Sequence, residues 1–276
     1  MNFSRSLIFA AASLGSMASA SVVNIDFNRL QTGGIPTATY VGLGAAPDNP
    51  ANTTWNGLNR PTSGSGITGT SLLDSAGLVT SVSINIPPTI GQGSAIGDQE
   101  LGGVPLTFDD LMFDSISIDS GAAGTLVTKS GTIAGLAVGG TYEIYFYSQG
   151  DDNNGNAAND GQNGLFAITS TLGGSVVGTA KQTGYDGVPG GNGILTENVE
   201  YVKFSATANS SGEIFFKWEN VVPGVNVATD NVPNNTNTGS RFAVLNGIQI
   251  VQVVPEPSSA LLALLGAFGL MARRRR

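Results

Sequence analysis

The stretch GGTYEIYFYS, residues 139–148, decides the fold class that the sequence predicts. Its side chains alternate between two faces, one carrying Tyr142, Ile144 and Phe146 and the other carrying Glu143, Tyr145 and Tyr147. A period of two is typical of a β-strand, and the two glycines at the start allow a tight turn into it. We therefore predict a strand here, with its apolar face pointing into a protein core.

Similar short segments follow one another between residues 22 and 254. The predicted strands are residues 22–28, 37–41, 78–86, 113–118, 124–128, 165–171, 175–180, 199–206, 213–218 and 241–254. Turn-forming residues separate them, and residues 31–70 read mainly as a long loop. No segment away from the two ends has a helical period. The pattern predicts an all-β fold: one β-sandwich, jelly-roll-like, with about ten strands.

Composition narrows the classes of function. Hydrophobic residues make up 41% of the 276 and charged residues 12%, with 39 glycines, which fits a folded chain of short strands and many turns. Residues 21–254 contain 7 basic and 19 acidic side chains, a formal net charge of −12 against −8 for the whole chain. An acidic surface repels phosphate groups, so the sequence predicts no nucleic-acid partner.

The chain has no cysteine and no histidine. This excludes disulfides, thiol nucleophiles, Ser-His-Asp triads and histidine-ligated zinc. We expect a protein that is not an enzyme. The alternative is a secreted polysaccharide hydrolase or lyase that uses carboxylates, for which Asp109, Asp110 and Asp114 are the candidates. Those three residues equally fit an exposed acidic turn.

The first 20 residues have the pattern of a secretion signal. Arg5 gives a positive start, residues 7–12 are apolar, and Ala18 and Ala20 form an A-x-A cleavage site. We predict that signal peptidase removes residues 1–20 and leaves residues 21–254 as the folded domain. The alternative is a buried N-terminal helix.

The last 22 residues have three parts in a fixed order. They are Pro255, Glu256 and Pro257, then a predicted transmembrane segment at residues 258–272, then Arg273, Arg274, Arg275 and Arg276. The arginines would stay in the cytoplasm and leave the domain on the far side of the membrane. The uninterrupted apolar run, residues 260–272, spans about 20 Å as a helix against roughly 30 Å of hydrocarbon. A transient membrane contact fits this length better than a permanent anchor, although an ordinary transmembrane helix is the alternative.

This tail resembles the PEP-CTERM family of sorting tails. The resemblance implies a Gram-negative-type bacterium and recognition by an exosortase, a membrane enzyme that cleaves near residues 255–257. It further implies a place on the cell surface or in an exopolysaccharide or biofilm matrix. The resemblance covers the tail alone and says nothing about the chemistry of the central domain.

Residues 135–147 and 243–250 are similar to jelly-roll carbohydrate-binding modules of the galactose-binding and malectin-like kinds. This likeness implies a sandwich with loops at one edge that hold a sugar. The candidate stacking residues are Trp55, Tyr145, Tyr147 and Tyr185, since flat aromatic faces match the apolar faces of pyranose rings. If the opposite face of residues 141–147 fills the core, then the face with Tyr145 and Tyr147 is open. The alternative is a second packed layer.

One loop is dense in oxygen ligands. Asp151, Asp152, Asn154 and Asp160 are candidates for a calcium site, because calcium takes six to eight oxygen ligands. The alternative is a solvated loop whose side chains form its own turns. The leading hypothesis is thus a non-catalytic surface protein that binds polysaccharide. The alternatives are the carboxylate enzyme and a purely structural surface component.

Overall fold

The computed structural model describes residues 21–28, 39–46, 54–59, 66–87, 111–112, 115–148, 163–184, 194–226 and 241–254. Residues Ser21–Val253 form one compact unit. The N-terminal signal helix and the C-terminal hydrophobic helix, which flank the domain in the predicted fold, lie outside the described residues.

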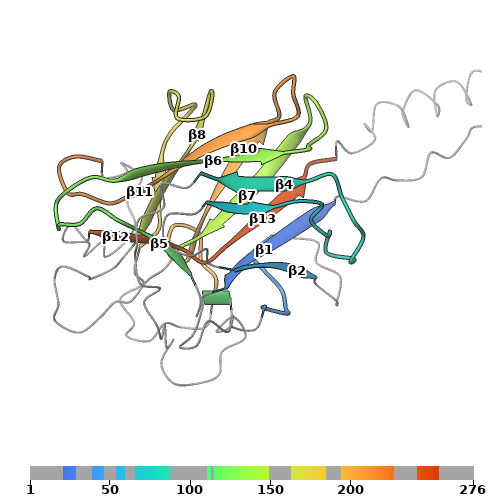
Figure 1. The fold of residues 1–276 in the computed structure, drawn as a ribbon, viewed down its shortest axis with the longest axis horizontal. Coiled ribbons are helices and arrows are strands. Elements are labelled where there is room, and N and C mark those ends of the chain that lie inside the picture. The colour runs from blue at the N-terminus through green and yellow to red at the C-terminus, as the bar shows by residue number, and fades with distance from the viewer. Residues whose placement is uncertain are drawn as a thin grey trace, which may run out of the picture. The chain divides into compact units, whose positions relative to one another are not determined.

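The described residues form two larger β-sheets and one strand pair (Figure 1). The first sheet has the order β10 (Tyr201–Thr207), β7 (Thr141–Tyr147), β13 (Gly247–Gln252), β1 (Val22–Asn28) and β2 (Trp55–Asn59). The second has the order β3 (Ile67–Gly69), β4 (Ser83–Ile86), β6 (Thr128–Ala134), β11 (Ile214–Asn220), β8 (Gly164–Thr169) and β9 (Lys181–Gln182). The pair is β12 (Phe242–Leu245) with β5 (Ile116–Asp119). These sheets confirm the predicted all-β class.

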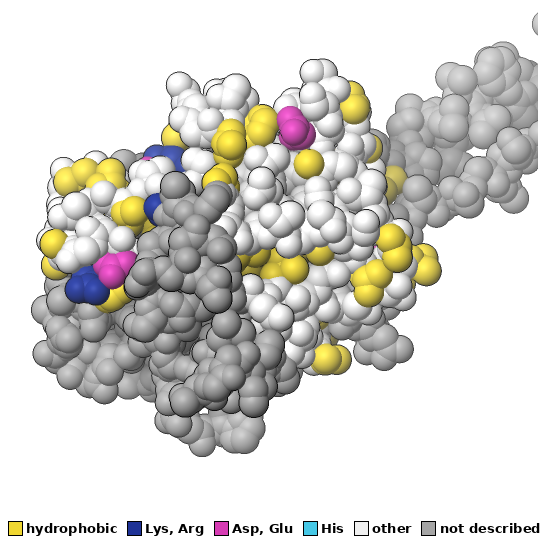
Figure 2. Space-filling view, in the orientation of Figure 1, with side chains coloured by type: hydrophobic (Ala, Val, Ile, Leu, Met, Phe, Trp, Pro, Cys, Tyr) yellow, Lys and Arg dark blue, Asp and Glu magenta, His cyan; other side chains and the backbone are white. Residues whose placement is uncertain are grey.

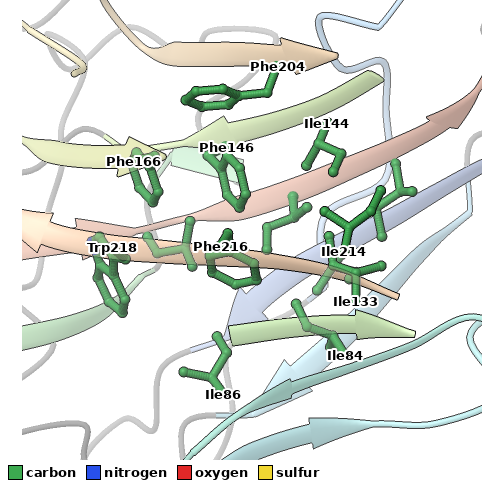
Figure 3. Packing of buried hydrophobic residues seen from close by; sticks show 14 of the residues in the cluster. Ile84, Ile86, Ile133, Ile144, Phe146, Phe166, Phe204, Ile214, Phe216 and Trp218 are labelled. Atoms are coloured by element: carbon green, nitrogen blue, oxygen red, sulfur yellow. The ribbon is translucent and has the colours of Figure 1, made fainter. Parts of the chain in front are cut away.

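One apolar core lies between the inner faces of the two larger sheets (Figure 3). The ring of Phe146 on β7 stacks on Phe166 of β8, with centroids 4.8 Å apart, and contacts Phe216 of β11 at 4.9 Å. Trp218 continues the layer, stacked on Phe166 at 6.5 Å. Burial of such large aromatic groups is the main driving force for joining the sheets. The face of β7 that packs into the core is therefore the face that the alternation in residues 139–148 predicts.

The chain changes sheets at Asn246, between β12 and β13. β12 pairs with β5, whereas β13 pairs with β1 and β7, so the Asn246-Gly247 step joins two sheets. The side chain of Asn246 donates a hydrogen bond to the carbonyl oxygen of Met112 at 2.9 Å. A Cβ atom at Gly247 would lie 2.8 Å from the carbonyl oxygen of Ile25, so glycine is required for this close crossing.

The structure differs from the predicted pattern between residues 31 and 70. Residues 39–41, predicted as part of a short strand, are irregular. β2 and β3 instead lie where the sequence reads as a loop. Both strands are short, and β2 pairs in parallel with β1. Long-range pairing therefore decides the structure of a segment whose local composition favours turns.

Candidate functional site

The predicted sugar-stacking residues Tyr145, Tyr147 and Trp55 lie on the outer face of the first sheet. In the register of the strands, Tyr145 is opposite Gln249 of β13, which in turn is opposite Asn24 of β1. All three aromatic side chains are buried, and Tyr147 is completely so. The face that the sequence offered as open is therefore the second packed layer that stood as the alternative.

Residues 39–46, which we name the cover segment, close this face. The amide of Ala45 donates to the hydroxyl of Tyr147 at 2.6 Å, and the amide of Ala46 donates to Oε1 of Gln249 at 3.0 Å. The Tyr147 hydroxyl itself donates to the same Gln249 oxygen. A Cβ atom at Gly44 would overlap the Gln249 amide, so the absence of a side chain lets the backbone approach the sheet closely.

The aromatic rings pack against protein groups. The ring of Trp55 makes edge contacts with Tyr40 at 5.2 Å and with Tyr147 at 6.3 Å, and its Nε1 donates to the carbonyl oxygen of Gly42 at 2.9 Å. Tyr145 packs on Tyr201 with ring centroids 5.7 Å apart. Stacking of a pyranose on Trp55 or Tyr147 would require the cover segment to leave the sheet.

Side-chain amides connect the strands beneath the cover segment. Nε2 of Gln249 donates to Oδ1 of Asn24 at 2.7 Å, and Nδ2 of Asn24 donates to the carbonyl oxygen of Thr54 at 3.0 Å. Asn56 donates to the backbone oxygen of Asn24 at 2.8 Å. Buried amides that are paired in this way fix one arrangement of β13, β1 and β2. Sequence reasoning missed this network. The available signal was that the outward positions Asn24 and Gln249 carry neutral amides rather than charged side chains.

The tyrosines of this face remain protonated at neutral pH. Burial raises the pKa of Tyr147 well above its ordinary value. Burial also raises the pKa of Tyr145, and its hydrogen bond to the Glu143 carboxylate, 2.9 Å long, raises it further. Burial likewise raises the pKa of Tyr201. The three phenols therefore serve as hydrogen-bonding and packing groups and supply no general base near neutral pH.

The other candidate residues lie outside the described residues. They are Ala18, Ala20, Asp109, Asp110, Asp114, Asp151, Asp152, Asn154, Asp160, Tyr185 and the tail residues 255–257 and 273–276. In the described part of the chain, no group of three or more acidic side chains could hold a metal ion. Calcium binding by the loop at 151–160 thus stays a prediction.

The two ends of the compact unit leave it side by side. β1 and β13 are antiparallel, with Val22 opposite Val251 (Figure 1). The amide of Gln252 donates to the carbonyl oxygen of Ser21 at 3.0 Å, and the amide of Val253 donates to that of Thr141 at 2.9 Å. Among the described residues, no helix is long and apolar enough to span a membrane.

Comparison with known protein families matches residues 253–276 to the PEP-CTERM protein-sorting motif. The match begins at Val253, directly after β13. The chain therefore carries the sorting signal of an exported protein that an exosortase processes at the membrane. A search among curated proteins found no match to the chain.

Proposed function

Because the chain carries a PEP-CTERM sorting motif, we propose that it is a structural protein of the cell surface or extracellular matrix of a Gram-negative-type bacterium. One observation carries this proposal. The sorting motif begins where the last described strand ends, so cleavage near residues 255–257 would release the β-sandwich with every strand that the structure describes. The domain is then the part of the protein that is delivered, and the tail is its sorting signal.

Two features support a domain that is not catalytic. The full sequence has no histidine or cysteine, the residues that most often act as acid-base groups and nucleophiles. In addition, the outer face that carries Trp55, Tyr145 and Tyr147 is closed by the cover segment and held by paired polar groups. A face of this kind stabilises the domain and keeps the rings away from solvent.

Sorting is tested by changing the tail while the domain is left intact. We expect a variant with Pro255→Ala, Glu256→Ala and Pro257→Ala to remain in the membrane fraction, whereas the unchanged chain reaches the cell surface. Val225→Ala, a substitution at an exposed position of the domain, is the matched control and should sort normally. Normal surface delivery of the triple variant would contradict the proposed sorting.

Polysaccharide binding is tested separately on an array of bacterial polysaccharides, with calcium and with a chelator. A structural component should bind none of them under either condition. Calcium-dependent binding that is lost on Asp151→Asn and Asp152→Asn would instead establish a sugar-binding function at that loop. Calcium-independent binding that is lost on Tyr185→Ala would assign the sugar-binding function to the Tyr185 ring. Turnover of a polysaccharide would favour the carboxylate enzyme.

A further inference from the structure

Exposed aliphatic side chains gather where the chain leaves the domain. We name this surface the exit face and define it by Ser21, Val253 and the turns at residues 76–81 and 135–140. On it Leu78 is 66% exposed, Val79 73%, Val138 67% and Val253 40%. Single exposed aliphatics are ordinary, but several together at one end of a domain indicate a contact surface.

Hydrogen bonds hold these turns beside the chain ends. The amide of Ser75 donates to the carbonyl oxygen of Val22 at 2.7 Å, which places the first turn next to the start of β1. The hydroxyl of Ser81 donates to the carbonyl oxygen of Gly135 at 2.6 Å and so joins the two turns. Ser21, Ser81, Gly135 and Gln252 also line one groove. The exposed aliphatics therefore keep a fixed position relative to Val253.

The exit face is poor in charge. The carboxylate of Asp74 is engaged in its own turn, where Oδ1 accepts the amide protons of Ala76 at 3.0 Å and Leu78 at 2.8 Å. Four cations of the described residues form ion pairs, and none of them belongs to the exit face: Lys181, Lys203, Lys217 and Arg241. Figure 2 shows hydrophobic side chains over the loop between β3 and β4, with Lys and Arg toward the opposite side of the view. A surface of this composition loses little hydration energy on contact with lipid.

The tail limits how far this surface can lie from a membrane. Four residues, 254–257, separate Val253 from the predicted transmembrane segment at 258. Fully extended, they span about 14 Å. The headgroup layer of one leaflet occupies roughly 5–8 Å of that distance. While the tail is inserted, Val253 therefore lies within about this distance of the lipid.

We infer that the exit face rests on the lipid headgroup region while the sorting tail is inserted, with Leu78, Val79 and Val138 as the contacting side chains. This inference rests on the proposed sorting function. The contact holds residues 255–257 at a constant height for a membrane-bound processing enzyme. Because the exit face has no cationic side chain among its described residues to attract anionic lipid, the domain leaves the membrane once the tail is cut.

The test uses the full chain reconstituted in vesicles of zwitterionic lipid. Because the chain has no cysteine, Val79→Cys, Val138→Cys and Val225→Cys each give one attachment site for an environment-sensitive fluorophore. Val225 is the matched control: it is 63% exposed, and it follows the end of β11 that is remote from the turns of the exit face. We expect a blue shift and several-fold stronger quenching by nitroxide-labelled lipid at positions 79 and 138, with a water-like dye at 225.

Two results would overturn the inference in different ways. If alkaline extraction retains the chain in the vesicles but the dyes at 79 and 138 behave like the dye at 225, the tail is inserted and the contact does not exist. If alkaline extraction releases the chain, the membrane-inserted stage of the proposed sorting fails, and the contact fails with it.

Discussion

At the scale of single residues, the hydroxyl of Tyr147 links two segments that are far apart in the sequence. It accepts the amide proton of Ala45, which is partly buried, and donates to the fully buried side chain of Gln249. We predict that Tyr147→Phe lowers the free energy of unfolding by about 1–3 kcal/mol, because the buried Gln249 side chain loses a hydrogen bond that water cannot replace. Urea denaturation measures this change.

Tyr145→Phe is the matched control for that substitution. The Tyr145 hydroxyl donates to the Glu143 carboxylate, which is partly exposed and can recover a water molecule. Loss of this hydrogen bond should lower the free energy of unfolding by less than about 1 kcal/mol. Equal costs for the two variants would mean that the cover segment adds nothing to the stability of the face.

The same tyrosines make stability depend on alkaline pH. Because burial raises the pKa of Tyr145 and Tyr147 in the folded state above the ordinary value of 10.0, the unfolded chain loses these protons first as the pH rises. Their contribution is therefore complete below about pH 10 and declines above it. We expect the urea midpoint to fall as the pH rises above about 10, and to fall less steeply in the Tyr145→Phe, Tyr147→Phe double variant. Equal slopes would contradict the assignment.

At the scale of elements, the turn before β7 sets the approach of the chain to the central strand. Gly135 has φ of 74°, and a Cβ atom there would overlap the carbonyl oxygen of Ser81. Gly139 has a similar φ of 70° but open space around it. We predict that Gly135→Ala lowers the free energy of unfolding by roughly 3 kcal/mol or more, whereas Gly139→Ala costs about 1 kcal/mol. Thermal unfolding of the two variants provides the comparison, and equal melting temperatures would contradict it.

Strand β6 shows why some elements escape prediction. The sequence predicts a weak strand at 124–128, whereas the observed strand is Thr128–Ala134 with Gly131 in its interior. Glycine lowers local β propensity, so pattern reasoning ends the strand too early. In the structure Gly131 is opposite Phe216, whose ring occupies the space that a side chain would fill. The strand is stabilised by a residue 85 positions away, which no local pattern can indicate.

Prediction of the outer face of the first sheet from the sequence had the same limitation. Alternation correctly gives β1 as Val22–Asn28 and the core side of β7, because both follow from a period of two. The same period cannot distinguish a polar face in water from a polar face under a covering segment. Asn24 is fully buried because residues 39–46 lie over this face, and their position depends on contacts with Tyr147 and Gln249.

At the scale of the whole molecule, the sorting signal is a short tail that follows the compact unit Ser21–Val253. The comparison with known families confirms the predicted PEP-CTERM motif. The motif could be predicted from the sequence because the order of its apolar run and its charged residues does not depend on folding. The chemistry of the domain could not be predicted in the same way, because Trp55, Tyr145 and Tyr147 acquire their roles only through tertiary packing.

The four terminal arginines provide a test of the tail as a membrane signal. We predict that replacing Arg273–Arg276 with alanine slows processing, because the cationic end that keeps the tail in the cytoplasm is lost. Replacement with four lysines is the matched control and should preserve processing if charge alone is read. Pulse-chase labelling of the shortened product measures the rate. Wild-type rates for the alanine variant would exclude a role for the charge.

The central claim is that the sorting tail is removed and the intact β-sandwich reaches the cell surface. The most direct measurement is the intact mass of the protein recovered from the surface of the producing cell. We predict a chain that begins at Ser21 and ends close to residues 255–257, without the apolar segment and the four arginines. A surface protein whose mass still includes residues 258–276 would contradict removal of the tail and would make the tail a permanent anchor.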